Sequence, residues 1–273
     1  MQYSRRTFLI TAAGACAAVV GGDAFAIEPG KVRVSRHEVP VPGLPRAFDG
    51  MRLAQVTDVH FPGSIAAASA TLAHLQREKP EIVVITGDMT ERAHALTLVA
   101  AFARQARGSL ATVATLGNWE YISHAWSRAE AAYRSVVVEL LVNAHREIRV
   151  GGSALALVGL DDPVLGRPDL LGARAGLPSD RSEIWLVHAP GFVSSPPQGS
   201  SIPAFILSGH THGGQIRLPF VPAYTPEGSG RFVAGWYTDT FAPLYVSRGI
   251  GTTAIPARFG CPTELPIFTL RRA

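Results

Sequence analysis

Cysteine is almost absent from this chain: Cys16 and Cys261 are the two thiols in 273 residues. Because Cys16 lies in a segment that we expect to be removed, one thiol remains and no intramolecular disulfide is predicted, which still permits an oxidising compartment. Charged residues are also scarce, at 17% against 47% hydrophobic residues. This balance excludes a disordered chain and indicates one large domain with an apolar core.

Blocks of Lys or Arg are absent from the body of the chain. The formal net charge is only +4, and the basic residues, nearly all Arg, are scattered. We therefore predict no nucleic-acid partner. The motif H-E-x-x-H is absent as well, which disfavours a metallopeptidase.

The N-terminus has the pattern of a targeting segment. Ser4-Arg5-Arg6-Thr7-Phe8-Leu9 is a twin-arginine pattern, an apolar run extends from Leu9 to Val20, and Ala24-Phe25-Ala26 suits a signal peptidase. We predict a cleaved signal over residues 1–26, export by the twin-arginine machinery to the periplasm or the cell exterior, and one domain over residues 27–273. An uncleaved membrane anchor is the alternative, because the run has marginal length for spanning a bilayer.

Strand-like and helical stretches alternate in the first half of the chain. We expect strands over Lys31–Pro40, Met51–Thr57, Ile82–Thr86 and Leu110–Leu116, and helices over Ile65–Glu78, Ala93–Arg107 and Ser127–Asn143, the last of them broken. This rhythm predicts a parallel core sheet with helices on its faces. Strands dominate afterwards, over Ala154–Leu160, Glu183–Val187, Ala204–Leu207, Leu244–Ser247 and Leu265–Leu270.

Five short segments carry potential metal ligands, and each follows a predicted strand. They are Thr57-Asp58-Val59-His60, Gly87-Asp88-Met89, Gly117-Asn118-Trp119-Glu120, His188-Ala189-Pro190 and Gly209-His210-Thr211-His212-Gly213-Gly214. Loops at the carboxyl ends of strands converge in open α/β sheets, so a shared site is expected. Imidazole, carboxylate and amide donors without a thiolate suit Mn²⁺, Fe or Zn²⁺ and disfavour a structural zinc site.

The order D-x-H, G-D, G-N-x-E, H-x-P and G-H-x-H resembles the calcineurin-like metallophosphoesterases. The pattern spans Asp58 to His212, and Ser247–Gly251, Arg258 and Pro262-Thr263-Glu264 resemble the exported bacterial branch, which includes phosphodiesterases and UDP-diacylglucosamine pyrophosphatase-like members. The resemblance implies a single-domain, four-layer α/β/β/α sandwich with mixed sheets. It also implies two divalent metal ions.

The resemblance further implies a role for each ligand. One ion would be held by Asp58, His60 and His212, the second by Asn118, His188 and His210, and both by Asp88. The resemblance assigns catalytic roles to Asp88, Asn118 and His188. The implied reaction is hydrolysis of a phosphomonoester, phosphodiester or pyrophosphate by in-line attack of a metal-bridging hydroxide. Taken singly, Asp58 or Asp88 could equally be a turn or helix-cap residue.

Trp119 departs from the family pattern, which usually has His after the Asn. An indole can donate a hydrogen bond but cannot deliver a proton near neutral pH. General-acid catalysis typically contributes about 10²–10⁴-fold. Either another group such as His124 substitutes, or the leaving group needs no proton, as in pyrophosphates and aryl phosphates.

Other assignments stay open at this stage. Trp119, His124 and Arg248 are candidates for substrate contact, although structural pairing is the alternative for Arg248. Tyr224, Phe232, Trp236 and Tyr237 form an aromatic stretch that either packs over a sheet edge or lines the substrate cleft or a membrane-facing surface. The substrate is expected to be a small-molecule or lipid-linked phosphate, with membrane-surface association as an option. Rival functions are a non-catalytic metal-binding scaffold and a lipid- or nucleotide-linked pyrophosphatase of the cell envelope.

Overall fold

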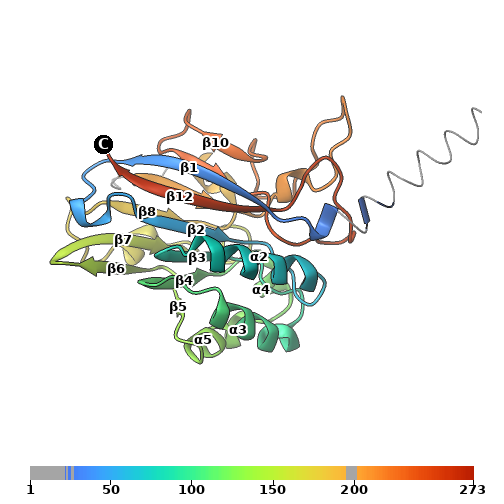
Figure 1. Ribbon diagram of the computed structural model, residues 1–273, viewed down its shortest axis with the longest axis horizontal. Helices are drawn as coiled ribbons and strands as arrows, with labels where there is room; N and C mark the ends of the chain where they lie inside the picture. The colour runs from blue at the N-terminus through green and yellow to red at the C-terminus, as the bar shows by residue number, and fades with distance from the viewer. Residues whose placement is uncertain (1–21, 23, 26–27, 195–201) are drawn as a thin grey trace, which may run out of the picture.

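The computed structural model of the protein describes residues 22, 24–25, 28–194 and 202–273 (Figure 1). The predicted signal over residues 1–26 lies almost entirely outside these ranges, and its cleavage and the export of the chain stay predictions. Within the described ranges, no helix is both long enough and apolar enough to cross a membrane.

The first of two mixed sheets in the described chain has the strand order β1-β12-β2-β3-β4-β5. The strands are β1 (Arg33–Val41), β2 (Arg52–Val56), β3 (Ile82–Thr86), β4 (Ala111–Thr115), β5 (Glu139–Leu140) and β12 (Glu264–Arg272). Strands β2 to β5 are parallel, as the alternation of strands and helices predicts. Strand β12 is antiparallel to β2 and parallel to β1, so it joins the two ends of the chain within one sheet.

The second sheet has the order β10-β11-β9-β8-β7-β6. The strands are β6 (Ala144–Val150), β7 (Ser153–Gly159), β8 (Glu183–Leu186), β9 (Phe205–Ser208), β10 (Gly235–Tyr237) and β11 (Leu244–Val246). Its central strands run parallel, and β6 and β10 are antiparallel edge strands. Neither of these edge strands is predicted from the sequence.

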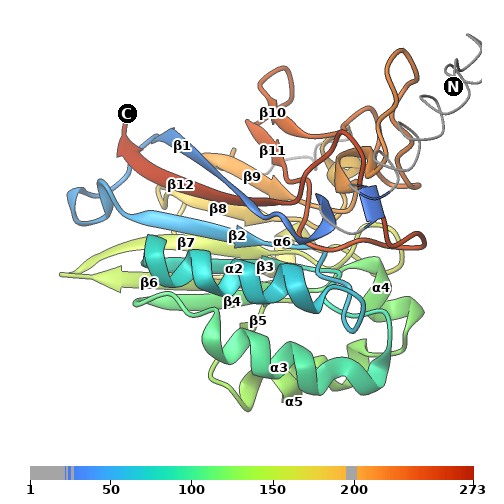
Figure 2. The same ribbon diagram turned by 45° about the vertical axis from the view of Figure 1, so that its right-hand side comes forward.

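Helices cover the sandwich unequally. Helices α2 (Ile65–Glu78), α3 (Leu96–Gln105) and α5 (Trp126–Arg134) lie on the outer face of the first sheet (Figures 1 and 2). The outer face of the second sheet is covered more thinly, by the four-residue helix α6 (Leu170–Ala173) and the 3₁₀ helix η5 (Pro190–Ser194). The predicted α/β sandwich with two mixed sheets is therefore confirmed. Its fourth layer consists of the short helices α6 and η5.

Alternation along β3 explains why its first four residues, Ile82 to Ile85, are all apolar. Val83 and Ile85 pack under the helices, whereas Ile82 and Val84 face the second sheet. All four side chains are fully buried. A strand covered on both faces needs apolar residues at every position, which is how this run was recognised.

The predicted helix over Ser127–Asn143 is wrong in its second half. Helix α5 ends at Arg134, and residues 139–140 form β5, which pairs with β4. Between them lies the run Val136-Val137-Val138. β-branched side chains lose freedom in a helix and suit a strand, and the open edge of the first sheet supplies the partner.

Five strands end at the same end of the sandwich, on the right in Figure 1. Strands β2, β3 and β4 of the first sheet and β8 and β9 of the second precede the five ligand-bearing segments. Hydrogen bonds hold neighbouring loops together: Asp58 N donates to the Gly87 carbonyl at 3.1 Å, and Gly209 N to the His188 carbonyl at 3.0 Å. The side chain of Gln55 joins the two sheets through the Ser208 carbonyl at 3.0 Å.

Candidate metal centre

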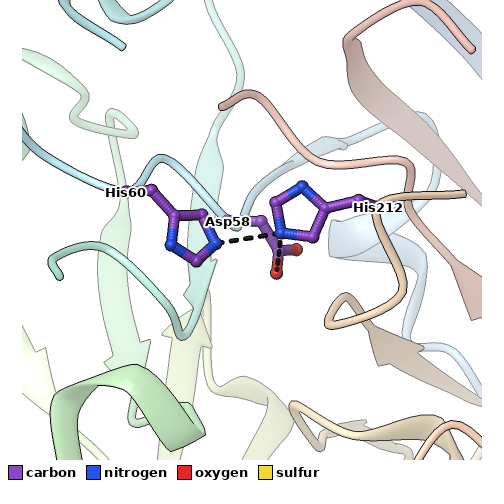
Figure 3. Close-up of side chains that lie close together, drawn as sticks. All are labelled: Asp58, His60 and His212. Atoms are coloured by element: carbon purple, nitrogen blue, oxygen red, sulfur yellow. Dashed lines mark hydrogen bonds and ion pairs between the residues drawn. The ribbon is translucent and has the colours of Figure 1, made fainter. Parts of the chain in front are cut away.

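Three candidate ligands meet at the junction of the two sheets (Figure 3). Nε2 of His60 lies 2.9 Å from Nε2 of His212, which in turn lies 3.5 Å from Oδ1 of Asp58. All three side chains are buried, and one ligand atom from each lies within 4.8 Å of the others. This is the spacing of donors around a single ion.

A second group lies beside the first. Asp88, His188 and His210 converge within the same 4.8 Å limit. The amide oxygen of Asn118 joins them, at 3.2 Å from Nε2 of His188 and 2.8 Å from Nδ1 of His210. The structure thus brings the seven expected ligands together in the two groups that the resemblance implies.

Asp88 faces both groups. Its Oδ2 lies 3.2 Å from Nε2 of His188 in the second group and 3.7 Å from Nε2 of His60 in the first. Burial raises the pKa of Asp88, but the charge and hydrogen bond of His188, the charge of His60 and the N–H of Trp119 together outweigh burial and lower the pKa to about 2. An ionised carboxylate between two sets of imidazoles is placed to contact two cations at once.

The donor chemistry fits cations. Nε2 of His210 lies 2.7 Å from the Glu227 carbonyl, and because a carbonyl only accepts, this nitrogen carries the proton. Burial first, and then the charge of His188, lowers the pKa of His210 to about 4, so the ring is neutral. Its Nδ1 therefore turns a lone pair toward the Asn118 oxygen at 2.8 Å. Two acceptors at this distance repel each other unless a cation binds both.

The backbone holds the ligands in uncommon conformations. Five of them have positive φ angles: Asp58 (56°), His60 (56°), Asp88 (53°), His210 (73°) and His212 (51°). For residues other than Gly this region costs free energy and clusters at functional sites. The strained loops aim the side chains inward from the strand ends.

Gly117 and Gly209 allow the loops to approach closely. A Cβ on Gly117 would lie 2.3 Å from Oδ1 of Asp88, and one on Gly209 would lie 2.3 Å from Oδ2 of Asp58. Any side chain at either position would displace a carboxylate of the centre. Glycine is therefore required immediately before Asn118 and His210, because a Cβ there would collide with the carboxylate of another ligand.

Comparison with known families decides the class of the site. The family model described as calcineurin-like phosphoesterase matches residues 51–214, which is more than half of the chain and includes all seven ligands. The chain belongs to the calcineurin-like phosphoesterase family. This makes it a metal-dependent phosphoester hydrolase, and its two ligand groups fit two divalent ions.

Relatives of this phosphoesterase occur in bacteria and animals. It is 29% identical to the uncharacterised metallophosphoesterase YkuE of Bacillus subtilis, over 99% of this chain and 98% of YkuE. It is 30% identical to a transmembrane protein with metallophosphoesterase domain from Bos taurus, over 88% of this chain but 57% of that protein. YkoQ of Bacillus subtilis is 25% identical, over 82% of this chain and 84% of YkoQ. The chain thus spans nearly all of YkuE but little more than half of the bovine relative.

A cleft of about 510 Å³ opens onto the metal centre of the phosphoesterase. Four of the candidate ligands, Asp88, Asn118, His210 and His212, belong to its polar lining. Most of the remaining lining is apolar, and it includes Trp119, Ile122, Ile216, Tyr224 and Ile255. A substrate phosphate at the ions would therefore carry its remaining groups along an apolar wall.

The substrate-contact candidates differ in position. Trp119 lines the cleft. His124 is exposed on the turn after α4 (Asn118–Ile122), and neither it nor Arg248 is among the cleft-lining residues. Arg248 lies with its Nη1 3.5 Å from Oε1 of Glu264.

The aromatic stretch is divided between the core and the cleft. Phe232 is buried, and Trp236 packs edge-on against Tyr245 with ring centroids 5.1 Å apart. Tyr237 meets Phe232 edge-on, and only Tyr224 of the four lines the cleft. Packing therefore explains most of the stretch.

Two carboxylates, Glu120 and Glu91, support the ligands in roles that the sequence does not predict. Glu120 accepts hydrogen bonds from the backbone N–H groups of Gly117, Asp88, Met89 and Thr90, so it fastens the Asp88 loop to the Asn118 loop. Its position in the G-N-x-E motif was the available signal. Glu91 lies with Oε1 3.3 Å from Nδ1 of His60, which leaves Nε2 of that ring facing the centre.

Arg258 supports the metal centre through hydrogen bonds to backbone carbonyls. Its buried guanidinium donates to the carbonyls of Gly251, Arg248, His212 and Cys261. The four carbonyls belong to three segments that surround the metal centre. One side chain therefore holds the His212 loop against the loop that follows β11.

Replacing Arg258 with Met should lower the free energy of unfolding by about 3 kcal/mol, because buried carbonyls lose their donors. Urea unfolding followed by circular dichroism would measure the change. Arg134→Met is the matched control: this exposed Arg pairs with Glu130 one turn away, and its loss should cost about 0.5 kcal/mol or less. Equal effects of the two substitutions would show that the Arg258 contacts contribute little.

Proposed function

We propose that the protein is a two-metal phosphoesterase that hydrolyses phosphodiester, phosphomonoester or pyrophosphate bonds with good leaving groups, outside the cytoplasm. The observation that carries the proposal is Asp88, one oxygen of which faces both imidazole groups at the floor of the cleft. A shared carboxylate suits two ions that act together on one phosphate.

The chain's own residues have distinct parts in this reaction. Asp58, His60 and His212 would hold one ion, and Asn118, His188 and His210 the other, with Asp88 between them. When bound, the ions supply Lewis acidity toward phosphate oxygens and lower the pKa of the water that they bind. The backbone N–H of Trp119 donates to Oδ1 of Asp88 at 2.8 Å and fixes the orientation of the shared carboxylate.

The cleft contains little that could protonate a leaving group. Its imidazoles are the candidate ligands His210 and His212, and the position next to Asn118 holds the indole of Trp119. This supports a substrate whose leaving group departs as an anion, such as a phenolate or a phosphate. Export is supported by the twin-arginine pattern, and the identity of the ions by the donor set, which suits Mn²⁺, Fe or Zn²⁺.

Removal of the ions should abolish activity, and their return should restore it. Protein stripped with a chelator should not hydrolyse bis(4-nitrophenyl) phosphate, and reloading with Mn²⁺ should restore the rate as the metal content approaches two ions per chain. Mass spectrometry of the metals and release of nitrophenolate measure both quantities. A full rate at one ion per chain would refute the two-metal mechanism, and no turnover with any metal would favour a non-catalytic scaffold.

A further inference from the structure

The loop between η6 (His212–Gly214) and β10 exposes large apolar side chains beside the cleft. Leu218 and Val221 are 53% and 56% exposed, and Phe220 is fully exposed. We call these three residues the apolar rim. Phe220 has a φ angle of 65°, so the backbone holds this side chain outward in a conformation that residues other than Gly seldom adopt. Exposed apolar side chains that cluster in this way indicate an interaction surface.

The apolar rim continues into the substrate cleft. Ile216 and Tyr224, which flank the rim in the same loop, both line the cleft. Ile122 and Ile255 add further apolar lining, and Trp119 lies beside the metal ligands. An apolar path therefore leads from the outer surface of the rim to the metal centre.

The N-terminal part of the chain joins the body at the same place. Arg258 N donates to the carbonyl of Ala24, which is buried, and Phe259 pairs with Arg217 at the base of the loop. Figure 2 shows the blue helix η2 (Glu28–Gly30) and the orange loop at the same end of the molecule. In the sequence, the apolar run Leu9 to Val20 ends four residues before Ala24. Where the N-terminal segment is retained as the uncleaved anchor, a run of this kind in a membrane would bring the rim to the membrane surface.

The charges around the rim suit an anionic surface. Residues 216–226 contain Arg217 and no Asp or Glu, and the first carboxylate of the loop is the exposed Glu227. Arg217 is exposed, next to Leu218. An apolar contact with an adjacent exposed cation, and with no carboxylate among its own residues, suits acidic lipid headgroups.

We propose that the apolar rim rests on an anionic lipid bilayer and that the cleft takes phosphate esters with an apolar chain from that surface. This inference rests on the proposed function, because it names the substrate class of the same site. The apolar chain follows the wall from the rim past Tyr224, and the phosphate reaches the ligands at the floor.

The test compares two forms of substrate with the full Mn²⁺-loaded chain. One is soluble bis(4-nitrophenyl) phosphate; the other is 4-nitrophenyl hexadecyl phosphate in vesicles of phosphatidylglycerol and phosphatidylcholine. The rim variant carries Leu218→Ser, Phe220→Ser and Val221→Ser. The control variant carries Val137→Ser and Leu171→Ser, at positions 73% and 67% exposed and away from the cleft. Vesicle flotation measures binding, and light scattering measures mass.

The rim variant should lose about tenfold or more of the vesicle rate and of vesicle binding, while its rate on the soluble diester stays within about twofold. The control should keep both rates. Equal vesicle rates for the two variants would overturn the inference, as would a wild-type dimer that the rim substitutions convert to a monomer. No soluble rate in the wild type would instead refute the proposed function, and the binding comparison would still decide whether the rim contacts lipid.

Discussion

Replacing Asp88 with Asn should reduce kcat/KM for bis(4-nitrophenyl) phosphate by about 1,000-fold or more, because the shared carboxylate supports both ions and thereby several kcal/mol of transition-state stabilisation. The change removes one negative charge and keeps the shape of the side chain. Since Oδ2 of Asp88 lies near both His188 and His60, metal content should fall below two ions per chain together with the rate.

Asp169→Asn is the matched control for this substitution. Asp169 caps α6 by accepting from Gly172 N at 2.9 Å, and it is exposed away from the cleft. The same chemical change there should leave the rate within about twofold, because it touches neither ion nor substrate. Full metal content and near-normal activity in the Asp88 variant would contradict the shared-carboxylate arrangement.

The second large effect concerns the leaving group. A 4-nitrophenyl ester should be hydrolysed at least about 100-fold faster than a matched alkyl ester, because the imidazoles among the described residues of the cleft are the candidate ligands His210 and His212, which are not free to protonate an alkoxide. Steady-state rates on methyl 4-nitrophenyl phosphate and dimethyl phosphate, with the same metal content, would give the ratio. Equal rates would end this hypothesis.

Two variants separate the causes of that preference. Trp119→His places an imidazole at the family's usual position and should raise the alkyl rate while leaving the aryl rate nearly unchanged. His124→Ala should change neither rate, because His124 is exposed and not among the cleft-lining residues. A loss confined to the alkyl ester in the His124 variant would identify that residue as the substitute acid.

The sequence predicted most strands and helices of the first sheet, because their patterns are local. Ile65–Glu78 is helical over the predicted bounds, and Ile82–Thr86 is a strand over the predicted bounds. The edge strand β6 (Ala144–Val150) was not predicted, because exposed polar residues interrupt its apolar pattern. Its strand conformation depends on pairing with β7, which a periodicity argument does not contain.

The candidate ligands were recognisable for a different reason. Each stands in a short motif after an apolar strand, and the order of the motifs along the chain carries the family resemblance. Glu91 stands outside such patterns, and Arg258, although it is part of the resemblance, makes contacts that no motif specifies. Their roles depend on contacts with His60 and His212, which are 31 and 46 residues away, and only the folded chain shows which partner each one meets.

The position of β12 sets the order in which the molecule can be completed. This strand, residues 264–272, lies between β1 and β2, and β1 pairs with β12. During synthesis, residues 33–41 must therefore wait for a partner that leaves the ribosome more than 200 residues later (264 − 41 = 223). The loop that accompanies β12 also reaches the ligands, since Ile250 N and Gly251 N donate to the carbonyls of Thr57 and Asp58. Closure of the first sheet therefore depends on the late-synthesised residues 264–272, which follow the loop that contacts the ligand segments.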